Sequence, residues 1–197
     1  MEISIIITNY NYEKYVARAI RSAINQSFNK NEYEIIVIDD CSIDQSRKII
    51  ESFGIVKPIF NDINLGLAAS CNKAIRIALG KFVYFLDADD FINKDTLLVC
   101  HSFASCNKDN MDAISTDYYE VSEKESVIRR RDGMAFPIRC GTLFYADHLI
   151  ELGPYNNDVK REDIDFRQRY LKSGKYIYNL PVPYYKYTQH NDSLTKK

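Results

Sequence analysis

The first hundred residues alternate between short apolar runs and segments with helical spacing. The apolar runs are rich in β-branched and aromatic residues and nearly continuous: Ile3–Ile7, Tyr33–Ile38, Val56–Phe60 and Lys81–Leu86. Strands that are covered on both faces have this pattern. We therefore predict an α/β fold in which these four strands form a mainly parallel central sheet flanked by helices, with right-handed crossovers.

The segments between these runs predict helices. Apolar residues recur at helical spacing over Tyr15–Ile24 and Leu67–Ala78, and Gly80 stands where a C′ glycine would end the second helix. Ser42-Ile43-Asp44-Gln45 has the form of a capping box that opens a helix toward Phe53.

The pattern weakens after Asp95. We expect helices over Thr96–Ser105 and Asp163–Ser173, the latter ended by Gly174, and strands over Ala113–Thr116 and Tyr176–Leu180. Glu120–Pro137 is polar and predicts a hairpin or a mobile loop. The remaining tail, Pro181–Lys197, is aromatic and then polar.

Length and charge narrow the class of protein. A chain of 197 residues fits one domain, and a net charge of -1 gives no basic field for nucleic acid. Five cysteines without a C-x-x-C pair are typical of free thiols in a reducing compartment. The longest apolar runs are of strand length and the start lacks a basic secretory segment, so we expect a cytoplasmic protein.

Polar groups stand at the ends of three predicted parallel strands: Thr8-Asn9-Tyr10, Asp39-Asp40 and Asp87-Ala88-Asp89-Asp90. Ligands of such sheets bind beyond the carboxyl ends of the strands, so these groups should converge on one edge. The last group is the most informative, because its three carboxylates repel one another unless a cation lies between them. Oxygen ligands of this kind suit Mg²⁺ or Mn²⁺. The alternative is an acidic loop that caps a helix starting near Asn93.

Four other groups have both a functional and an ordinary interpretation. A carboxylate of Asp39-Asp40 could accept the imide N–H of uracil or cap a helix. Asp163 could be a general base or an acid at a helix N-terminus. His190 could bind a metal or phosphate or be solvated. Lys73 and Arg129–Arg131 could contact phosphates or form solvated surface.

Taken in order, these segments resemble the family 2 glycosyltransferases of the GT-A fold. The matching motifs are Ile5-Ile6-Ile7-Thr8-Asn9-Tyr10-Asn11, Glu34–Asp44, Asn64-Leu65-Gly66-Leu67-Ala68, Gly80–Asp90 and Arg161-Glu162-Asp163-Ile164-Asp165-Phe166. The match is close over residues 3–100 and loose over 141–195. The resemblance implies a single GT-A domain over 1–197, with a nucleotide-binding half (1–100) and an acceptor-binding half (101–197).

The resemblance also implies an activity: inverting transfer of a sugar from a nucleotide-diphosphate donor, with UDP favoured, to a hydroxyl of a glycan or lipid-linked acceptor. Synthesis of a surface polysaccharide or glycoconjugate is the expected setting. Mn²⁺ or Mg²⁺ is the expected cofactor. No nucleic-acid partner is expected; a homodimer through the Tyr-rich tail, and peripheral association with the inner face of the membrane, stay open.

Residue roles carry over from the matching motifs. Thr8 and Asp39 would hold the base, and Tyr10 would lie near the nucleotide. Asp87 and Asp89 occupy the acidic positions of the Asp-x-Asp motif, with Asp89 preferred as the direct metal ligand, and Asp163 matches the catalytic base. Asn9, Asn72 and Ala88 would also contact the donor, and His190 would also bind the metal.

Two departures from the family pattern remove cations from the diphosphate side. Cys71 stands where many members carry Arg, and Tyr187-Thr188-Gln189-His190 stands for Tyr-Arg-x-His. Lys73, Lys186 or Arg129–Arg131 could compensate, and Glu120–Pro137 is the candidate closing loop. The missing cations favour an alternative, a non-catalytic nucleotide-sugar-binding or scaffold protein. A nucleotidyltransferase would need a Gly-rich basic phosphate loop, which Thr8–Tyr12 is not.

Overall fold

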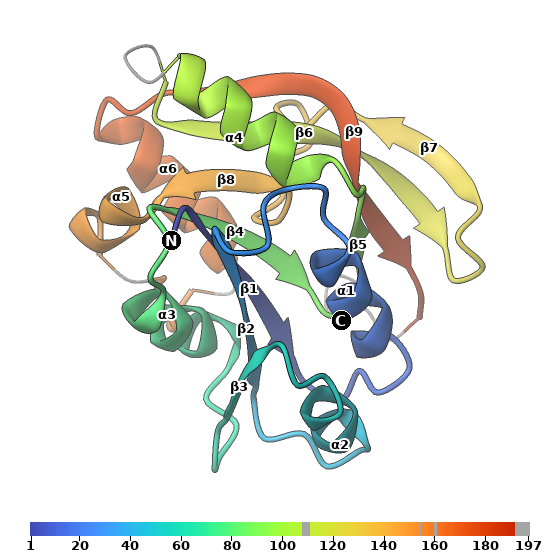
Figure 1. The fold of residues 1–197 in the computed structure, drawn as a ribbon. Coiled ribbons are helices and arrows are strands. Elements are labelled where there is room, and N and C mark those ends of the chain that lie inside the picture. Colours follow the sequence, from blue (N-terminus) through green and yellow to red (C-terminus); the bar gives the residue numbers. More distant parts are fainter. Residues whose placement is uncertain (108–110, 154, 160, 192–197) are drawn as a thin grey trace.

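Four parallel strands form one half of a nine-stranded sheet in the computed structural model, which describes residues 1–107, 111–153, 155–159 and 161–191 (Figure 1). They are β1 (Ile3–Asn9), β2 (Tyr33–Asp39), β3 (Lys57–Phe60) and β4 (Phe82–Asp87). The order across the sheet is β3-β2-β1-β4-β8-β6-β9-β5, and β7 pairs with β6. The predicted α/β fold is confirmed.

The central strand is the most deeply buried. Ile3, Ile5, Ile6 and Ile7 of β1 are all fully buried, because β2 and β4 flank the strand and helices cover the sheet. Each such side chain contributes about 1.5–3 kcal/mol relative to an exposed one. The near-continuous apolar runs therefore reflect strands with no solvent-facing side.

The helices of the first half cover opposite faces of this sheet. They are α1 (Val16–Ile24), α2 (Ser46–Glu51) and α3 (Leu67–Ile77). From β1 to β2 to β3 the chain adds strands toward one edge of the sheet. The next strand, β4, lies instead on the other side of β1. Right-handed crossovers then place α1 and α2 on one face and α3 on the other, as Figure 1 shows.

The second half joins the sheet through antiparallel pairing. β8 (Thr142–Tyr145) is antiparallel to both β4 and β6 (Ala113–Ser122), and β7 (Val127–Arg131) is antiparallel to β6. The elements that complete this half are β5 (Phe91–Ile92), α4 (Thr96–Cys106), α5 (Ala146–Glu151), α6 (Glu162–Lys172) and β9 (Ile177–Gln189). Gly174 follows α6 with φ of 82°, the conformation of a C′ glycine, as predicted.

Three local predictions are wrong for identifiable reasons. α2 begins at Ser46 rather than at a capping box, because the Ser42 hydroxyl donates to Asp39 Oδ1 at 2.5 Å. Gly80 does not adopt positive φ; it is needed because a Cβ there would lie 2.4 Å from the Ser4 backbone nitrogen. The acidic cluster does not cap a helix, since β5 follows it and α4 begins only at Thr96.

The C-terminal tail is more regular than its sequence predicts. Most of it continues the strand β9, which runs parallel to β6 as far as Gln189. Pro183 pairs with Asp117 where the register shifts, and such irregularities are where strands tolerate proline. Residues 192–197 of the tail lie outside the described part of the chain.

Glu120–Pro137 contains the β6–β7 hairpin, so the hairpin alternative is the one observed. All five cysteines are free thiols, and Cys71, Cys100 and Cys140 are buried. Among the described residues, no helix combines the length and apolar character that crossing a bilayer requires.

Candidate functional site

The carboxyl ends of β1, β2 and β4 bring the predicted polar groups together at one edge of the sheet. Asn9 Nδ2 donates to Asp39 Oδ1 at 2.7 Å, and Thr8 Oγ1 donates to Asp87 Oδ1 at 3.3 Å. The backbone N–H of Ala88 donates to the carbonyl oxygen of Thr8 at 3.2 Å. These contacts follow from the register, in which Asn9 is opposite Asp39 and Thr8 is opposite Asp87.

The acidic cluster concentrates negative charge beside this edge. Asp87, Asp89 and Asp90 each place a carboxylate oxygen within 4.8 Å of the others. Burial raises the pKa of Asp89, and the neighbouring charge of Asp87 raises it further. Burial and the charges of Asp89 and Asp87 also raise the pKa of Asp90 well above its usual range. Such shifts are expected where carboxylates share a partly dry site.

Asp90 has a structural task within this cluster. Its Oδ2 accepts a hydrogen bond from Tyr185 Oη at 2.6 Å, and its Oδ1 accepts one from the Thr188 backbone nitrogen at 2.7 Å. Asp90 thus fastens β9 to the end of β4. Asp87 and Asp89 are left as the candidate metal ligands, and their oxygens fit a hard divalent cation.

His190 is part of the site rather than a solvated tail residue. Its Nε2 lies 2.8 Å from Asp89 Oδ2, and its ring lies 4.8 Å from that of Tyr15 between centroids. The side chain is 0% exposed. Its Nδ1 is buried without a hydrogen-bond partner in the part of the chain that is described. The three residues predicted as metal ligands, Asp87, Asp89 and His190, therefore lie together.

Two arginines stand beside the positions where family cations are missing. Arg139 Nη1 lies 3.1 Å from the sulfur of Cys71, and its Nη2 donates to Asp87 Oδ1. Arg18 Nη2 donates to Thr188 Oγ1 at 2.7 Å and to the Asp89 carbonyl oxygen at 2.6 Å. Positive charge is thus supplied from α1 and from the segment before β8, which no sequence motif indicated.

The cations predicted to compensate lie elsewhere. Lys73 Nζ donates to Asn61 Oδ1 at 2.6 Å, and Lys186 Nζ lies 4.0 Å from the centroid of the Tyr119 ring. Arg129 and Arg131 pair with Glu120, each at 2.6 Å. Arg130 pairs with Asp117 at 2.6 Å. The arginine run therefore stabilises the β6–β7 hairpin.

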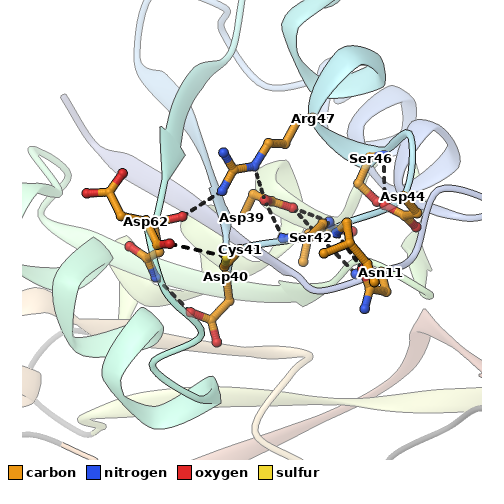
Figure 2. A network of polar contacts seen from close by, with 12 residues as sticks. Asn11, Asp39, Asp40, Cys41, Ser42, Asp44, Ser46, Arg47 and Asp62 are labelled. Atoms are coloured by element: carbon orange, nitrogen blue, oxygen red, sulfur yellow. Dashed lines mark hydrogen bonds and ion pairs between the residues drawn. The ribbon is translucent and has the colours of Figure 1, made fainter.

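The two aspartates after β2 have different environments (Figure 2). Asp39 is fully buried, and its carboxylate accepts four hydrogen bonds, from Asn9, from Arg47 and from the backbone and hydroxyl of Ser42. Asp40 is also buried and accepts three, at Oδ1 from Asn61 Nδ2 (2.8 Å) and the Leu65 backbone nitrogen (2.9 Å) and at Oδ2 from the Gly66 backbone nitrogen (2.8 Å). Both carboxylates are therefore engaged within the protein, Asp39 in the loop after β2 and Asp40 with the segment that leads into α3.

Tyr10 and Asn72 complete the predicted donor residues. Tyr10 is 44% exposed beside the end of β1, so its ring is accessible for stacking. The Asn72 side chain instead pairs with the Tyr155 backbone, donating to its carbonyl at 2.9 Å and accepting from its nitrogen at 2.8 Å. Asn72 thus holds the loop before α6 against α3.

Asp163, the predicted base, shares a small cavity with Arg139. The cavity has a volume of about 20 Å³, and Tyr155 and Arg167 also line it. This is room for about one water molecule. The neighbouring Glu162 is half-buried, and burial raises its pKa, with the charges of Asp163 and Asp87 adding to the effect. The cavity therefore lies between the acidic cluster and the first turn of α6.

Comparison with known proteins agrees with this architecture. The sequence profile described as Glycosyl transferase family 2 matches residues 4–173. The chain belongs to this family. Its sheet and helices are those of a family 2 glycosyltransferase domain of the GT-A fold.

Several relatives are named as glycosyltransferases. The poly(ribitol-phosphate) beta-N-acetylglucosaminyltransferase TarS of Staphylococcus aureus is 39% identical over 107 residues, which are 49% of this chain and 18% of TarS. The crystal structure of TarS 1–349 in complex with UDP-GlcNAc superposes with a TM-score of 0.86 at 26% identity, covering 100% of this chain and 61% of that one.

A more distant structure shares the fold alone. The mannosyltransferase PcManGT of Pyrobaculum calidifontis, in complex with GDP-Man and Mn²⁺, has a TM-score of 0.75 at 18% identity, over 95% of this chain and 56% of that one. The family 2 chain described here thus spans less than two thirds of the TarS and PcManGT chains.

Proposed function

We propose that this family 2 glycosyltransferase chain transfers a sugar from a UDP-sugar to an acceptor hydroxyl with inversion at the anomeric carbon. The observation that carries the proposal is that Arg139 contacts Asp87, which shares the acidic cluster with Asp89, and also lines the cavity of Asp163. The relation to the TarS structure in complex with UDP-GlcNAc supports a UDP-linked donor.

The donor would lie across the carboxyl ends of β1, β2 and β4. Tyr10 offers an exposed ring for the base. The imide contact would be made at the Asp39-Asp40 pair, whose carboxylates are both buried and accept four and three hydrogen bonds within the protein. Residues 1–100 would then form the nucleotide-binding half and 101–197 the acceptor-binding half.

A divalent cation, Mn²⁺ or Mg²⁺, would be held by Asp87 and Asp89 with His190 beside them. When bound, it supplies positive charge for the diphosphate that leaves. Asp163 takes the proton of the acceptor hydroxyl as that oxygen forms a bond to C1 and the bond from C1 to the phosphate oxygen breaks. Attack from the face opposite the leaving group gives inversion.

The acceptor would approach from the side of α3 and α6. A cleft of about 540 Å³ there is lined by polar groups, among them Arg76, Asn156, Asn157 and Arg169. It meets the smaller cavity at Tyr155. Asp158 also lines the cleft and Arg169 pairs with Asp165 at 3.0 Å, so Arg76 and the amides are the groups that suit an acceptor carrying phosphate and hydroxyl groups. TarS is named for such a polymer, poly(ribitol-phosphate).

The proposal is tested by turnover. Purified protein is incubated with UDP-GlcNAc, UDP-glucose or GDP-mannose, with Mn²⁺ or EDTA, and with or without poly(ribitol-phosphate). We expect Mn²⁺-dependent release of UDP that increases when acceptor is added, and a β-linked product by NMR. Donor binding without transfer to this or any other tested surface polymer would favour the non-catalytic alternative, and a retained α-linkage would refute inversion.

A further inference from the structure

Arg139 is a buried cation in contact with a predicted metal ligand. Its side chain is 5% exposed, and Nη2 donates to Asp87 Oδ1. Two thiols are close to the guanidinium, Cys71 at 3.1 Å and Cys140 at 3.6 Å, and the Phe85 ring centroid is 5.5 Å away. A weakly polar pocket of this kind leaves Asp87 as the strong partner of Arg139.

The guanidinium of Arg139 has an N–H group that makes no hydrogen bond to the described residues. Nε of Arg139 is buried and has no hydrogen-bond partner among the described residues. An arginine guanidinium keeps its charge throughout the ordinary pH range. A permanently charged group with an unused N–H therefore borders both the acidic cluster and the cavity of Asp163.

The Asp87 carboxylate would interact with two cations, Arg139 and the divalent metal ion. Asp87, Asp89 and Asp90 lie within 4.8 Å of one another, and unpaired they would repel strongly. Arg139 relieves that repulsion at Asp87 when no metal is bound. A divalent cation that binds in the cluster is therefore repelled by Arg139, because Arg139 contacts Asp87, one of the two main ligands of the metal.

We propose that Arg139 is an internal counter-ion of Asp87, which weakens metal binding to the empty site and couples it to arrival of the nucleotide diphosphate. The inference rests on the proposed function. When the diphosphate enters, its negative charge offsets the repulsion between metal and guanidinium. The unused N–H groups of Arg139 can then donate to phosphate or sugar oxygens. Arg139 acts here as a positioning residue.

Cys71 leaves room for the Arg139 guanidinium beside Asp87. It is fully buried on α3, and its small side chain leaves the space beside Asp87 that the guanidinium occupies. An arginine at position 71 would approach the same carboxylate from α3. The double variant Cys71→Arg/Arg139→Gln therefore moves the counter-ion from one segment to another without changing its number.

The test measures binding of Mn²⁺ alone to the nucleotide-free protein by electron paramagnetic resonance. Removing a positive charge next to the metal should strengthen binding in Arg139→Gln at least ~10-fold. We expect Arg139→Lys to stay within about threefold of the unchanged protein, since it keeps the charge. Cys71→Arg/Arg139→Gln should return the affinity toward the original value. Arg21→Gln, an exposed arginine of α1, controls for loss of net charge.

Circular dichroism and the melting temperature confirm folding of each variant, and Arg139→Met replaces Arg139→Gln if the latter fails to fold. Unchanged or weaker Mn²⁺ binding in a folded, uncharged variant would overturn the counter-ion role. UDP affinity of the unchanged protein in Mn²⁺ is measured in parallel. Its absence would count against the proposed function, whereas UDP binding with no effect of Arg139→Gln on Mn²⁺ would refute only this inference.

Discussion

The imidazole Nε2 of His190 lies 2.8 Å from Oδ2 of Asp89, although 101 positions separate the two residues in the chain. β9 makes this contact possible, because Asp90 holds Tyr185 and Thr188 of that strand against the end of β4. His190 is therefore delivered to the acidic cluster by the sheet itself, and its buried ring either supports Asp89 or binds the metal directly.

Replacing this histidine should weaken metal-dependent donor binding. We expect His190→Gln to lower the affinity for UDP in Mn²⁺ roughly 10–100-fold, the usual cost of losing a group that ligates or orients a metal ligand. Isothermal titration calorimetry measures the change. His101→Gln is the matched control, because His101 pairs with Glu2 at 3.0 Å, away from the cluster. Equal affinities for the two variants would remove His190 from the site.

Asp163 should matter for transfer and not for donor binding. We expect Asp163→Asn to lower kcat by roughly 10²–10⁴-fold, the range for loss of a general base, with the Kd for UDP unchanged. Asp147→Asn, an exposed acid in the first turn of α5, should keep full activity. If Asp163→Asn retained transfer, the base would have to be sought elsewhere, with the half-buried Glu162 as the next candidate.

Gly80 should be needed for packing rather than for a helix terminus. A Cβ at this position would lie 2.4 Å from the Ser4 nitrogen and 2.6 Å from the Ile3 carbonyl carbon. We expect Gly80→Ala to lower the free energy of unfolding by about 1–3 kcal/mol, because the backbone of β1 has to move. At Gly54 a Cβ would meet nothing within 4 Å, so Gly54→Ala should be nearly neutral in urea unfolding. Equal stability of the two variants would contradict the close approach.

The β6–β7 hairpin should lose stability in acid. Burial opposes ionisation of Glu120, but its bonds to Arg131 and Arg129 prevail and lower its pKa below 4.5. A lowered folded-state pKa means that the contribution is complete above pH 4.5 and is lost as the pH falls through the folded value. Glu120→Gln should cost about 2 kcal/mol at pH 7.

The pH profile of thermal unfolding checks this assignment. Between pH 7 and pH 3.5 the melting temperature of Glu120→Gln should fall less than that of the unchanged protein. Parallel profiles for the two proteins would show that the arginine run contributes nothing through Glu120.

The fold of the first hundred residues could be predicted because their strands carry a local signal. Ile3–Ile7 is apolar except for Ser4, Phe82–Leu86 is apolar throughout, and polar residues stand directly at the strand ends. Parallel pairing then brings Asp39 and Asp87 to the same edge whatever the details of the helices. Asp87 and Asp89 follow β4 to this edge, whereas His190 reaches Asp89 from the end of β9.

The parts that were missed depend on contacts between distant segments. Nothing near Arg139 in the sequence indicates that it meets Asp87, 52 positions earlier. The strand β9 was underestimated because Pro181 and Pro183 interrupt its pattern, and it tolerates them because its pairing with β6 shifts register beside them. The different partners of Asp39 and Asp40 likewise became visible only in the structure, where Arg47 and Ser42 bind the first and Asn61 and Gly66 bind the second.

The most direct test of a metal-bridged nucleotide-sugar site is calorimetric titration of UDP into the protein with Mn²⁺ and with EDTA, repeated for Asp89→Asn. We predict that the unchanged protein binds UDP at least ~10-fold more tightly with Mn²⁺ and that Asp89→Asn abolishes this difference. UDP affinity that is the same with Mn²⁺ and with EDTA would contradict the account.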